Sequence, residues 1–375
     1  KKQNKREKKA MKLKIRLLGL LALVISAVLV SPGADACTGT RLKAKDGSVV
    51  PGRTLEFAKN LDSHVIVIPR NFEITGVTPW GENGLKWKTR YAVVGANFCG
   101  ESVVIDGLNE KGLSGGFFYF PGYAEYQKVA PSDKAKTISE WQLLTWILSS
   151  FETISEVKKA LYEIKVAGVV FAKWGFVLPG HFIITDQEGN SIVIEYVKGQ
   201  LNIYDNPFGV ITNAPGFDWH TANIANYLNL STSDVSSKKI AGETIAPFGQ
   251  GSGLFGIPGD FTPPSRFIRV LFLTISSIET ENARDTVSQL FHILNSFDIP
   301  KGAIREKKGE VTQEDYTQWT TAQDLRNRNY YFKTENNSRI RVVHLLKCNL
   351  DAKEIAGLKM ETPGEDVLDI TSELK

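Results

Sequence analysis

Cys37 is a cysteine whose position in the chain could make it a catalytic nucleophile. It follows Ala34, Asp35 and Ala36, a pattern typical of the site at which a secretory signal peptide is removed. Cleavage before Cys37 would place a thiol and a free α-amine on one residue. The thiol could attack a carbonyl carbon, and the amine, with a pKa of about 7.7–8.0, could act as base and then as proton donor. The pattern therefore predicts a cysteine nucleophile at the start of the mature chain.

Residues 1–36 have the composition of a secretory signal peptide. Nine lysines and arginines lie there against Glu7 and Asp35, and residues 17–30 form a mostly apolar run. As a helix this run would span about 21 Å, less than the ~30 Å hydrocarbon core of a bilayer. We therefore expect residues 1–36 to be removed and residues 37–375 to form a single domain. The product would be exported, periplasmic or secreted, with no stable membrane anchor.

The basic leader also decides how the net charge is interpreted. The whole chain carries +4, and the leader, with nine basic and two acidic residues, carries +7, so residues 37–375 carry −3. This balance gives no reason to expect nucleic acid as a partner. The three cysteines, Cys37, Cys99 and Cys348, are too few for a disulfide framework, and a Cys99–Cys348 pair is left open.

A predicted hairpin positions Cys37. Asp46 and Gly47 separate two alternating segments, so Cys37 begins one strand and residues 49–57 return beside it, with Cys37 opposite the region of Glu56. Arg53 and Glu56 are three residues apart, and strict alternation would place them on opposite faces. A bulge at residues 51–52, which are Pro and Gly, could re-aim one of them.

Hairpins and separate helical blocks follow along the chain. Strands are predicted within residues 102–120, in a meander over 181–213 with turns at 188–190 and 198–199, and over 316–346. Helices are predicted over 137–164, with caps at Thr137 and Thr153, and over 265–278 and 282–297. Grouped strands with helices in separate blocks predict an α+β layered domain.

Four separated stretches are similar to motifs of one family. They are C-T-G-T-R with G-R-T-L-E-F (residues 37–41 and 52–57), D-G-L-N-E-K-G-L (106–113), N-P-F-G-V-I-T-N-A-P (206–215) and P-G-D-F-T-P-P-S-R-F-I-R (258–269). In this order they resemble the choloylglycine hydrolase family, which comprises bile salt hydrolases and penicillin V acylases. The resemblance implies an N-terminal nucleophile hydrolase, whose fold is a four-layer αββα sandwich of two antiparallel sheets.

The same resemblance implies roles for individual residues. The matching positions are Cys37 (nucleophile), Arg53 (the arginine beside it), Glu56 (where most members have Asp), Tyr119 (a backbone oxyanion donor), Asn213 (the side-chain oxyanion donor) and Arg266 (the second arginine). Glu56 departs from the family pattern, because its extra methylene moves the carboxylate by over ~1 Å. Tyr119 stands where penicillin V acylases have Tyr and many bile salt hydrolases have Asn.

The implied activity is hydrolysis of a linear, non-peptide amide C–N bond through a thioester on Cys37. The expected partner is a small amphipathic N-acyl substrate, such as penicillin V, another N-acyl amide or a conjugated bile salt. No metal or organic cofactor is needed, and relatives suggest a homotetramer. Tyr119 favours penicillin V or N-acyl amides, including N-acyl homoserine lactones, and bile salt hydrolysis is the main alternative.

Two alternatives from other classes are kept open. A conventional Cys–His hydrolase would need a histidine beside Cys37, and the candidates are His64, His181, His220, His292 and His344. A non-catalytic envelope lipoprotein or binding module would carry an acyl group on Cys37, although Asp35 fits the required lipobox poorly. A binding module would not need the arginines and the asparagine in this order.

Overall fold

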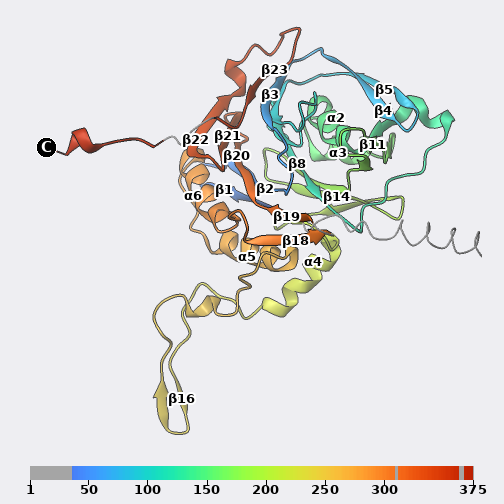
Figure 1. Cartoon of the computed structure of the whole chain (residues 1–375). Helices are drawn as coiled ribbons and strands as arrows, with labels where there is room; N and C mark the ends of the chain where they lie inside the picture. Colours follow the sequence, from blue (N-terminus) through green and yellow to red (C-terminus); the bar gives the residue numbers. More distant parts are fainter. Residues whose placement is uncertain (1–35, 309–310, 363–366, 375) are drawn as a thin grey trace, which may run out of the picture. The chain divides into compact units, whose positions relative to one another are not determined.

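Two antiparallel sheets form the centre of the fold (Figure 1). The computed structural model describes residues 36–308, 311–362 and 367–374, so the predicted leader lies outside the described residues except for Ala36. The five-stranded sheet has the order β1 (Cys37–Lys43), β2 (Val49–Glu56), β20 (Thr317–Asp324), β21 (Asn329–Thr334) and β22 (Asn337–His344). The eight-stranded sheet has the order β15 (Gln200–Asp205), β14 (Ser191–Val197), β13 (Gly180–Thr185), β8 (Ser114–Tyr119), β7 (Asp106–Asn109), β6 (Val93–Ala96), β3 (His64–Ile68) and β23 (Ala356–Lys359).

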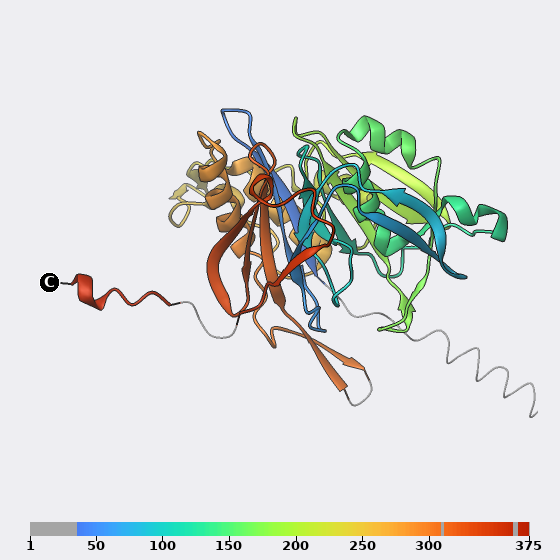
Figure 2. The ribbon, with the colours of Figure 1, turned by 90° about the horizontal axis from the view of Figure 1, so that it is seen from above.

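Helices cover the outer faces of both sheets. Helices α5 (Pro263–Ser276) and α6 (Ala283–Asn295) pack on the five-stranded sheet, and α2 (Leu143–Ser150) and α3 (Ile154–Ala160) pack on the eight-stranded sheet. Figure 2 shows the two helical layers on opposite sides of the strands. The largest apolar cluster includes inward-facing residues of both sheets, among them Leu55, Val94 and Phe118. The predicted α+β, four-layer αββα sandwich is confirmed.

Shorter elements decorate this sandwich. Helix α4 (Phe217–Asn223) precedes a long loop, and five small two-stranded sheets complete the described secondary structure. These pairs are β4 (Glu73–Thr78) with β5 (Gly81–Lys88), β9 (Thr137–Ser139) with β10 (Lys165–Ala167), β11 (Val170–Phe171) with β12 (Phe176–Val177), β16 (Lys238–Ile240) with β17 (Glu243–Ile245), and β18 (Ile304–Lys308) with β19 (Val311–Asp315). None of the described helices is long and apolar enough to cross a bilayer.

The predicted hairpin that carries Cys37 is present, with its bulge in a different place. Cys37 pairs with Leu55, next to Glu56, and Gly47 turns the chain at φ +84°. The bulge predicted at Pro51–Gly52 is wrong, because pairing with β1 and β20 is regular there. Gly52 is needed for close packing instead, since a Cβ on it would lie 2.4 Å from the Thr321 carbonyl oxygen. The register shifts between Leu55 and Glu56.

One tetrapeptide, T-I-S-E, occurs twice and folds in two ways. At residues 153–156 it forms the predicted capping box, in which the Thr153 hydroxyl and the Glu156 carboxylate each accept the other residue's backbone N–H. At residues 137–140 the predicted helix start is wrong: β9 pairs with β10, and α2 begins at Leu143. The carboxylate of Glu140 accepts the backbone N–H groups of Val169 and Leu178, so tertiary contacts replace the cap.

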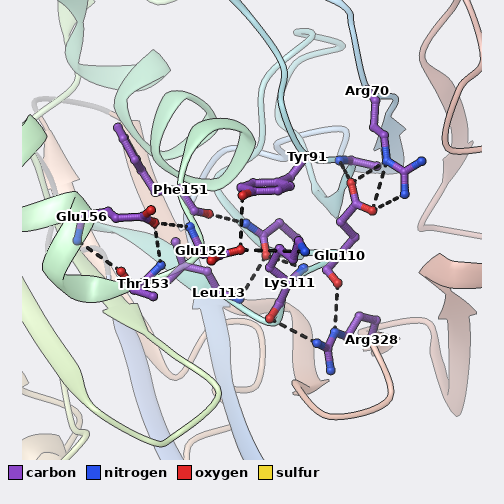
Figure 3. A network of polar contacts seen from close by, with 12 residues as sticks. Arg70, Tyr91, Glu110, Lys111, Leu113, Phe151, Glu152, Thr153, Glu156 and Arg328 are labelled. Atoms are coloured by element: carbon purple, nitrogen blue, oxygen red, sulfur yellow. Dashed lines mark hydrogen bonds and ion pairs between the residues drawn. The ribbon is translucent and has the colours of Figure 1, made fainter.

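The D-G-L-N-E-K-G-L stretch forms a turn that ties together distant segments. The Glu110 carboxylate pairs with Arg70 and accepts the Ala92 backbone N–H, and the Glu110 carbonyl accepts from Arg328 Nε (Figure 3). Fully buried Asn109 accepts two backbone N–H groups of the turn and donates to two carbonyls at the end of α2. This motif therefore braces the β7–β8 hairpin against α2 and the C-terminal strands.

The hairpin of β16 and β17 projects from the rest of the domain (Figure 1). Residues 231–252 are almost all exposed. Four large apolar side chains of this segment lie at the surface: Val235, Ile240, Ile245 and Phe248.

Candidate active site

Cys37 opens onto a cavity between the two sheets. The side chain is buried at the first residue of β1 and lines this cavity. Arg53 and Glu56 are its charged lining residues. The rest of the lining is almost entirely apolar: Leu55, Phe57, Leu61, Phe98, Ile105, Phe117, Tyr119, Trp174 and Leu178. The cavity therefore combines a nucleophile with a mostly apolar lining.

The bulge in β2 explains how Arg53 and Glu56 meet at Cys37. Strict alternation separates residues three apart onto opposite faces, but the shift between Leu55 and Glu56 turns the Glu56 side chain back toward the cavity. The structure thus brings together two residues that the regular pattern would have separated.

Arg53 supplies a buried positive charge beside the thiol. Its Nη1 donates to the Phe117 carbonyl and its Nε to the Thr54 carbonyl, and the guanidinium lies 3.9 Å from the Phe118 ring centroid. Its buried Nη2 has no hydrogen-bond partner among the described residues. Burial raises the pKa of the Cys37 thiol, and the Arg53 charge opposes this rise because it favours the thiolate.

Glu56 is a fully buried carboxyl with half of its hydrogen-bonding capacity unused. Its Oε1 accepts from Thr317 Oγ1 at 2.8 Å, and its Oε2 has no hydrogen-bond partner in the described part of the chain. Burial raises the pKa of Glu56 to about 8, against the lowering effect of the Arg266 charge. Buried polar atoms are nearly always paired in native proteins, so this orphaned oxygen indicates a missing donor.

The Asn213 side chain connects the Cys37 backbone with Tyr119. Its Oδ1 accepts from the Cys37 nitrogen at 2.8 Å and from Arg266 Nη2 at 2.6 Å, and its Nδ2 donates to the Tyr119 carbonyl at 2.8 Å. These partners fix the amide orientation, because a flipped amide would face its NH₂ toward two donors. The bond to the Tyr119 carbonyl is the one hydrogen bond that Nδ2 donates to the described residues.

Arg266 fixes the backbone around the nucleophile. It lies in the first turns of α5, is buried, and donates through Nη1 to the Cys37 carbonyl and to Thr38 Oγ1. Burial lowers the pKa of Arg266 to about 10, and Glu56 and Cys37 act in the opposite direction. At neutral pH this arginine is a cation that fixes the Cys37 backbone and the Asn213 side chain relative to each other.

The structure brings all six predicted site residues together. Tyr119 lines the cavity, with its ring edge-on to Phe57 at a centroid distance of 5.7 Å. The contributors that were not predicted from the sequence include Trp174, which stacks on Phe57 at 5.2 Å, and Thr317, which holds Glu56. Nothing in the local pattern of Trp174 marks it as a pocket residue, whereas Thr317 lies within the Y-T-Q-W-T-T stretch of a predicted strand.

Histidines and the other cysteines contribute no alternative chemistry at this cavity. Within residues 36–308, 311–362 and 367–374, no hydrogen bond joins a histidine to Cys37. His220, the histidine nearest the sequence motifs, donates to the Asn213 carbonyl instead. Cys99 and Cys348 are free thiols, so the disulfide left open above is not formed. The described residues contain no cluster of three or more potential metal ligands.

A four-layer αββα sandwich with a cysteine at the start of its first strand defines the class of N-terminal nucleophile hydrolases. Residues 37–357 match the family model described as linear amide C–N hydrolases, choloylglycine hydrolase family. The chain belongs to this family and is an amide C–N hydrolase of the bile salt hydrolase and penicillin V acylase type.

Individual relatives agree in sequence and in structure. A bile salt hydrolase/transferase of Clostridium perfringens is 36% identical over 86% of this chain and 96% of its own length. A penicillin V acylase of Pectobacterium atrosepticum is 24% identical over 83% of this chain and 81% of its own length. A crystal structure of a conjugated bile acid hydrolase variant from Clostridium perfringens superposes with a TM-score of 0.80, at 34% identity, over 89% of this chain and all of the other.

Proposed function

We propose that the chain is an exported cysteine amidase that loses residues 1–36 and uses Cys37 as an N-terminal nucleophile. The observation that carries this proposal is the position of Cys37 at the start of β1. Its thiol faces Arg53 and Glu56, and its nitrogen lies 2.8 Å from Asn213 Oδ1. The basic and apolar composition of the leader supports export to the periplasm or the medium.

The reaction begins with the Cys37 thiolate, which Arg53 favours by its charge. Attack on the amide carbon forms a C–S bond, and the carbonyl oxygen becomes an oxyanion that accepts the second Nδ2 hydrogen of Asn213. The C–N bond then breaks, the protonated α-amine of Cys37 gives its proton to the leaving nitrogen, and an acyl thioester remains. Water, deprotonated by the same amine, hydrolyses the thioester to the acid and restores the thiol.

A freed α-amine would also satisfy the orphaned atoms at the site. In the structure the Cys37 nitrogen belongs to the peptide bond with Ala36, and Glu56 Oε2 and Thr54 Oγ1 are both buried without hydrogen-bond partners among the described residues. An ammonium group has three donors where a peptide nitrogen has one. Its extra hydrogens would offer a partner to the Glu56 carboxylate in addition to Asn213, and the local positive charge would lower the pKa of Glu56.

Conjugated bile salts are the first substrate class to test. The relatives at 33–36% identity are named bile salt hydrolase/transferase, and the apolar cavity lining suits an apolar acyl group. Penicillin V and other N-acyl amides are the second class. Tyr119 supports them, because the resemblance places Tyr at this position in penicillin V acylases.

Two measurements test the proposal. Sequencing of the secreted protein should begin at Cys37, and a different N-terminus would remove the base from the mechanism. Purified Cys37→Ser should lose turnover of glycocholate, taurocholate, penicillin V and a long-chain acyl homoserine lactone, all assayed side by side with the wild type. Undiminished hydrolysis by Cys37→Ser would refute the assignment of the nucleophile.

We also propose that the domain assembles as a homotetramer. The projecting β16–β17 hairpin supports association, because its exposed apolar side chains, Ile240, Ile245 and Phe248, have no covering surface among the described residues. Light scattering coupled to size-exclusion chromatography should give four times the mass of the mature chain. A monomeric mass at micromolar concentration would contradict this.

A further inference from the structure

Two buried histidines hold the consecutive peptide groups that carry the Asn213 side chain. His181, in β13, lies 3.0 Å through Nε2 from the Thr212 carbonyl oxygen. His220, in α4, lies 2.9 Å through Nε2 from the Asn213 carbonyl oxygen. Both imidazoles are at most 2% exposed. Neither lines the cavity at Cys37, so their effect on a substrate would pass through Asn213.

His181 is hydrogen-bonded to the buried carboxyl of Glu195. Its Nδ1 lies 3.0 Å from Glu195 Oε1, an oxygen that also accepts the Phe217 backbone N–H, and both side chains are 1% exposed. A carbonyl oxygen can only accept, so Nε2 of His181 donates to the Thr212 carbonyl. The ring also stacks parallel on Phe120 at 4.2 Å. Contacts on both edges and on one face leave this ring a single orientation.

His220 acts as a neutral donor. Its Nδ1 is buried and has no hydrogen-bond partner in the described part of the chain, and burial lowers the pKa of the ring to about 4. The proton therefore resides on Nε2, facing the Asn213 carbonyl. The ring stacks on Phe267 of α5 at 4.7 Å, one residue after Arg266, which itself binds Asn213 Oδ1. Helix α5 therefore contacts Asn213 in two ways: Phe267 supports the ring that binds the Asn213 carbonyl, and Arg266 binds the Asn213 side chain.

We propose that His181, Glu195 and His220 are positioning residues for the oxyanion donor Asn213. Together they fix two successive peptide groups from β13, β14 and α4, while Arg266 and Tyr119 fix the amide itself. A donor must lie within hydrogen-bond distance of the developing oxyanion, and displacements of ~1 Å cost about 10²-fold in rate. This inference rests on the proposed function, in which the Asn213 amide donates to the oxyanion.

The test replaces the donors without changing the nucleophile. In His220→Phe the ring keeps its stacking on Phe267 but cannot donate, and in Glu195→Gln an amide replaces the carboxyl beside His181 while an oxygen remains for the Phe217 N–H. Each variant should lower kcat about 10- to 100-fold for whichever of glycocholate or penicillin V the wild type hydrolyses. KM should stay within about twofold, and iodoacetamide should alkylate Cys37 at the wild-type rate.

Matched variants separate positioning from general damage. His220→Gln retains a donor and should recover part of the kcat, which also provides a readout if His220→Phe does not fold. His292→Gln changes an exposed histidine of α6 and should behave as wild type. Unchanged kcat in both His220→Phe and Glu195→Gln, or a parallel loss of Cys37 alkylation, would overturn the inference. Asn213→Ala distinguishes the two proposals: if it retains full kcat, the oxyanion role in the proposed function fails as well.

Discussion

Replacing Glu56 with Gln should change how stability depends on pH. Burial raises the pKa of Glu56 from 4.5 to about 8, and the Arg266 charge and the hydrogen bond from the Thr317 hydroxyl only partly oppose this. Between these pH values the folded chain holds a proton that the unfolded chain has released. A raised carboxyl pKa stabilises the folded state fully below the unfolded pKa, and this stabilisation is lost as the pH rises through the folded pKa.

The expected size of the effect follows from the two pKa values. A rise from 4.5 to about 8 corresponds to about 5 kcal/mol of unfolding free energy, because each tenfold change in an ionisation constant is worth about 1.4 kcal/mol. Urea unfolding followed by tryptophan fluorescence would be measured near pH 5 and near pH 9, on the chain that retains Ala36. Wild type and Glu56→Gln should be similar in stability at the lower pH. At the higher pH Glu56→Gln should be more stable by up to about 5 kcal/mol.

The comparison between variants isolates Glu56 from other titrating groups. Burial also raises the pKa of Glu140 to about 8. Because Glu140 is present in both proteins, its contribution cancels in the difference between their unfolding free energies. Glu188→Gln, at an exposed turn, serves as the control and should follow the wild-type pH dependence. Parallel stability curves for wild type and Glu56→Gln would show that Glu56 titrates normally in the folded chain. In a chain that begins at Cys37, the added ammonium group should reduce the difference.

Three further substitutions test the fold and the cavity. Asn109→Ala should lower the unfolding free energy by about 2–4 kcal/mol in urea titrations, because it strips hydrogen bonds from buried backbone groups; a smaller loss than in a surface Asn variant would contradict the bracing role. Tyr119→Asn should raise the kcat/KM ratio of glycocholate to penicillin V, and an unchanged ratio would show that Tyr119 does not select the substrate. Trp174→Ala removes the ring stacked on Phe57 and should raise KM for bulky acyl substrates about tenfold, with kcat nearly unchanged; a KM within twofold of wild type would exclude Trp174 from substrate binding.

Local sequence was sufficient for most of the strands and for the layered architecture. Gly47, Gly189 and Gly199 take up positive φ at hairpin turns that the glycine pattern predicts, and alternating apolar residues mark the strands on either side. The Thr153 cap was predictable for the same reason, because all its partners lie within four residues. Such elements are determined by neighbours in the chain.

Features that depend on distant partners were not predictable in this way. The irregularity at Leu55–Glu56 arises against β20, about 260 residues away, and no local residue marks it. Glu140 forms backbone hydrogen bonds across the fold instead of a cap. The six site residues come from β1, β2, β8, α5 and the loop before α4. From the sequence, only the similarity to a known family predicts that they share one site.

The pairing of β2 with β20 helps to bury the peptide bond before Cys37. In the folded domain Ala36 is 2% exposed and its carbonyl accepts the Glu56 backbone N–H, so the bond before Cys37 is sealed inside the sandwich. Glu56 is held in turn by Thr317, which is synthesised 261 residues later. If residues 1–36 are removed as proposed, the peptidase must reach the bond before Cys37 while the polypeptide is still open. Under that proposal, cleavage slower than folding would leave a folded chain with a blocked Cys37 nitrogen.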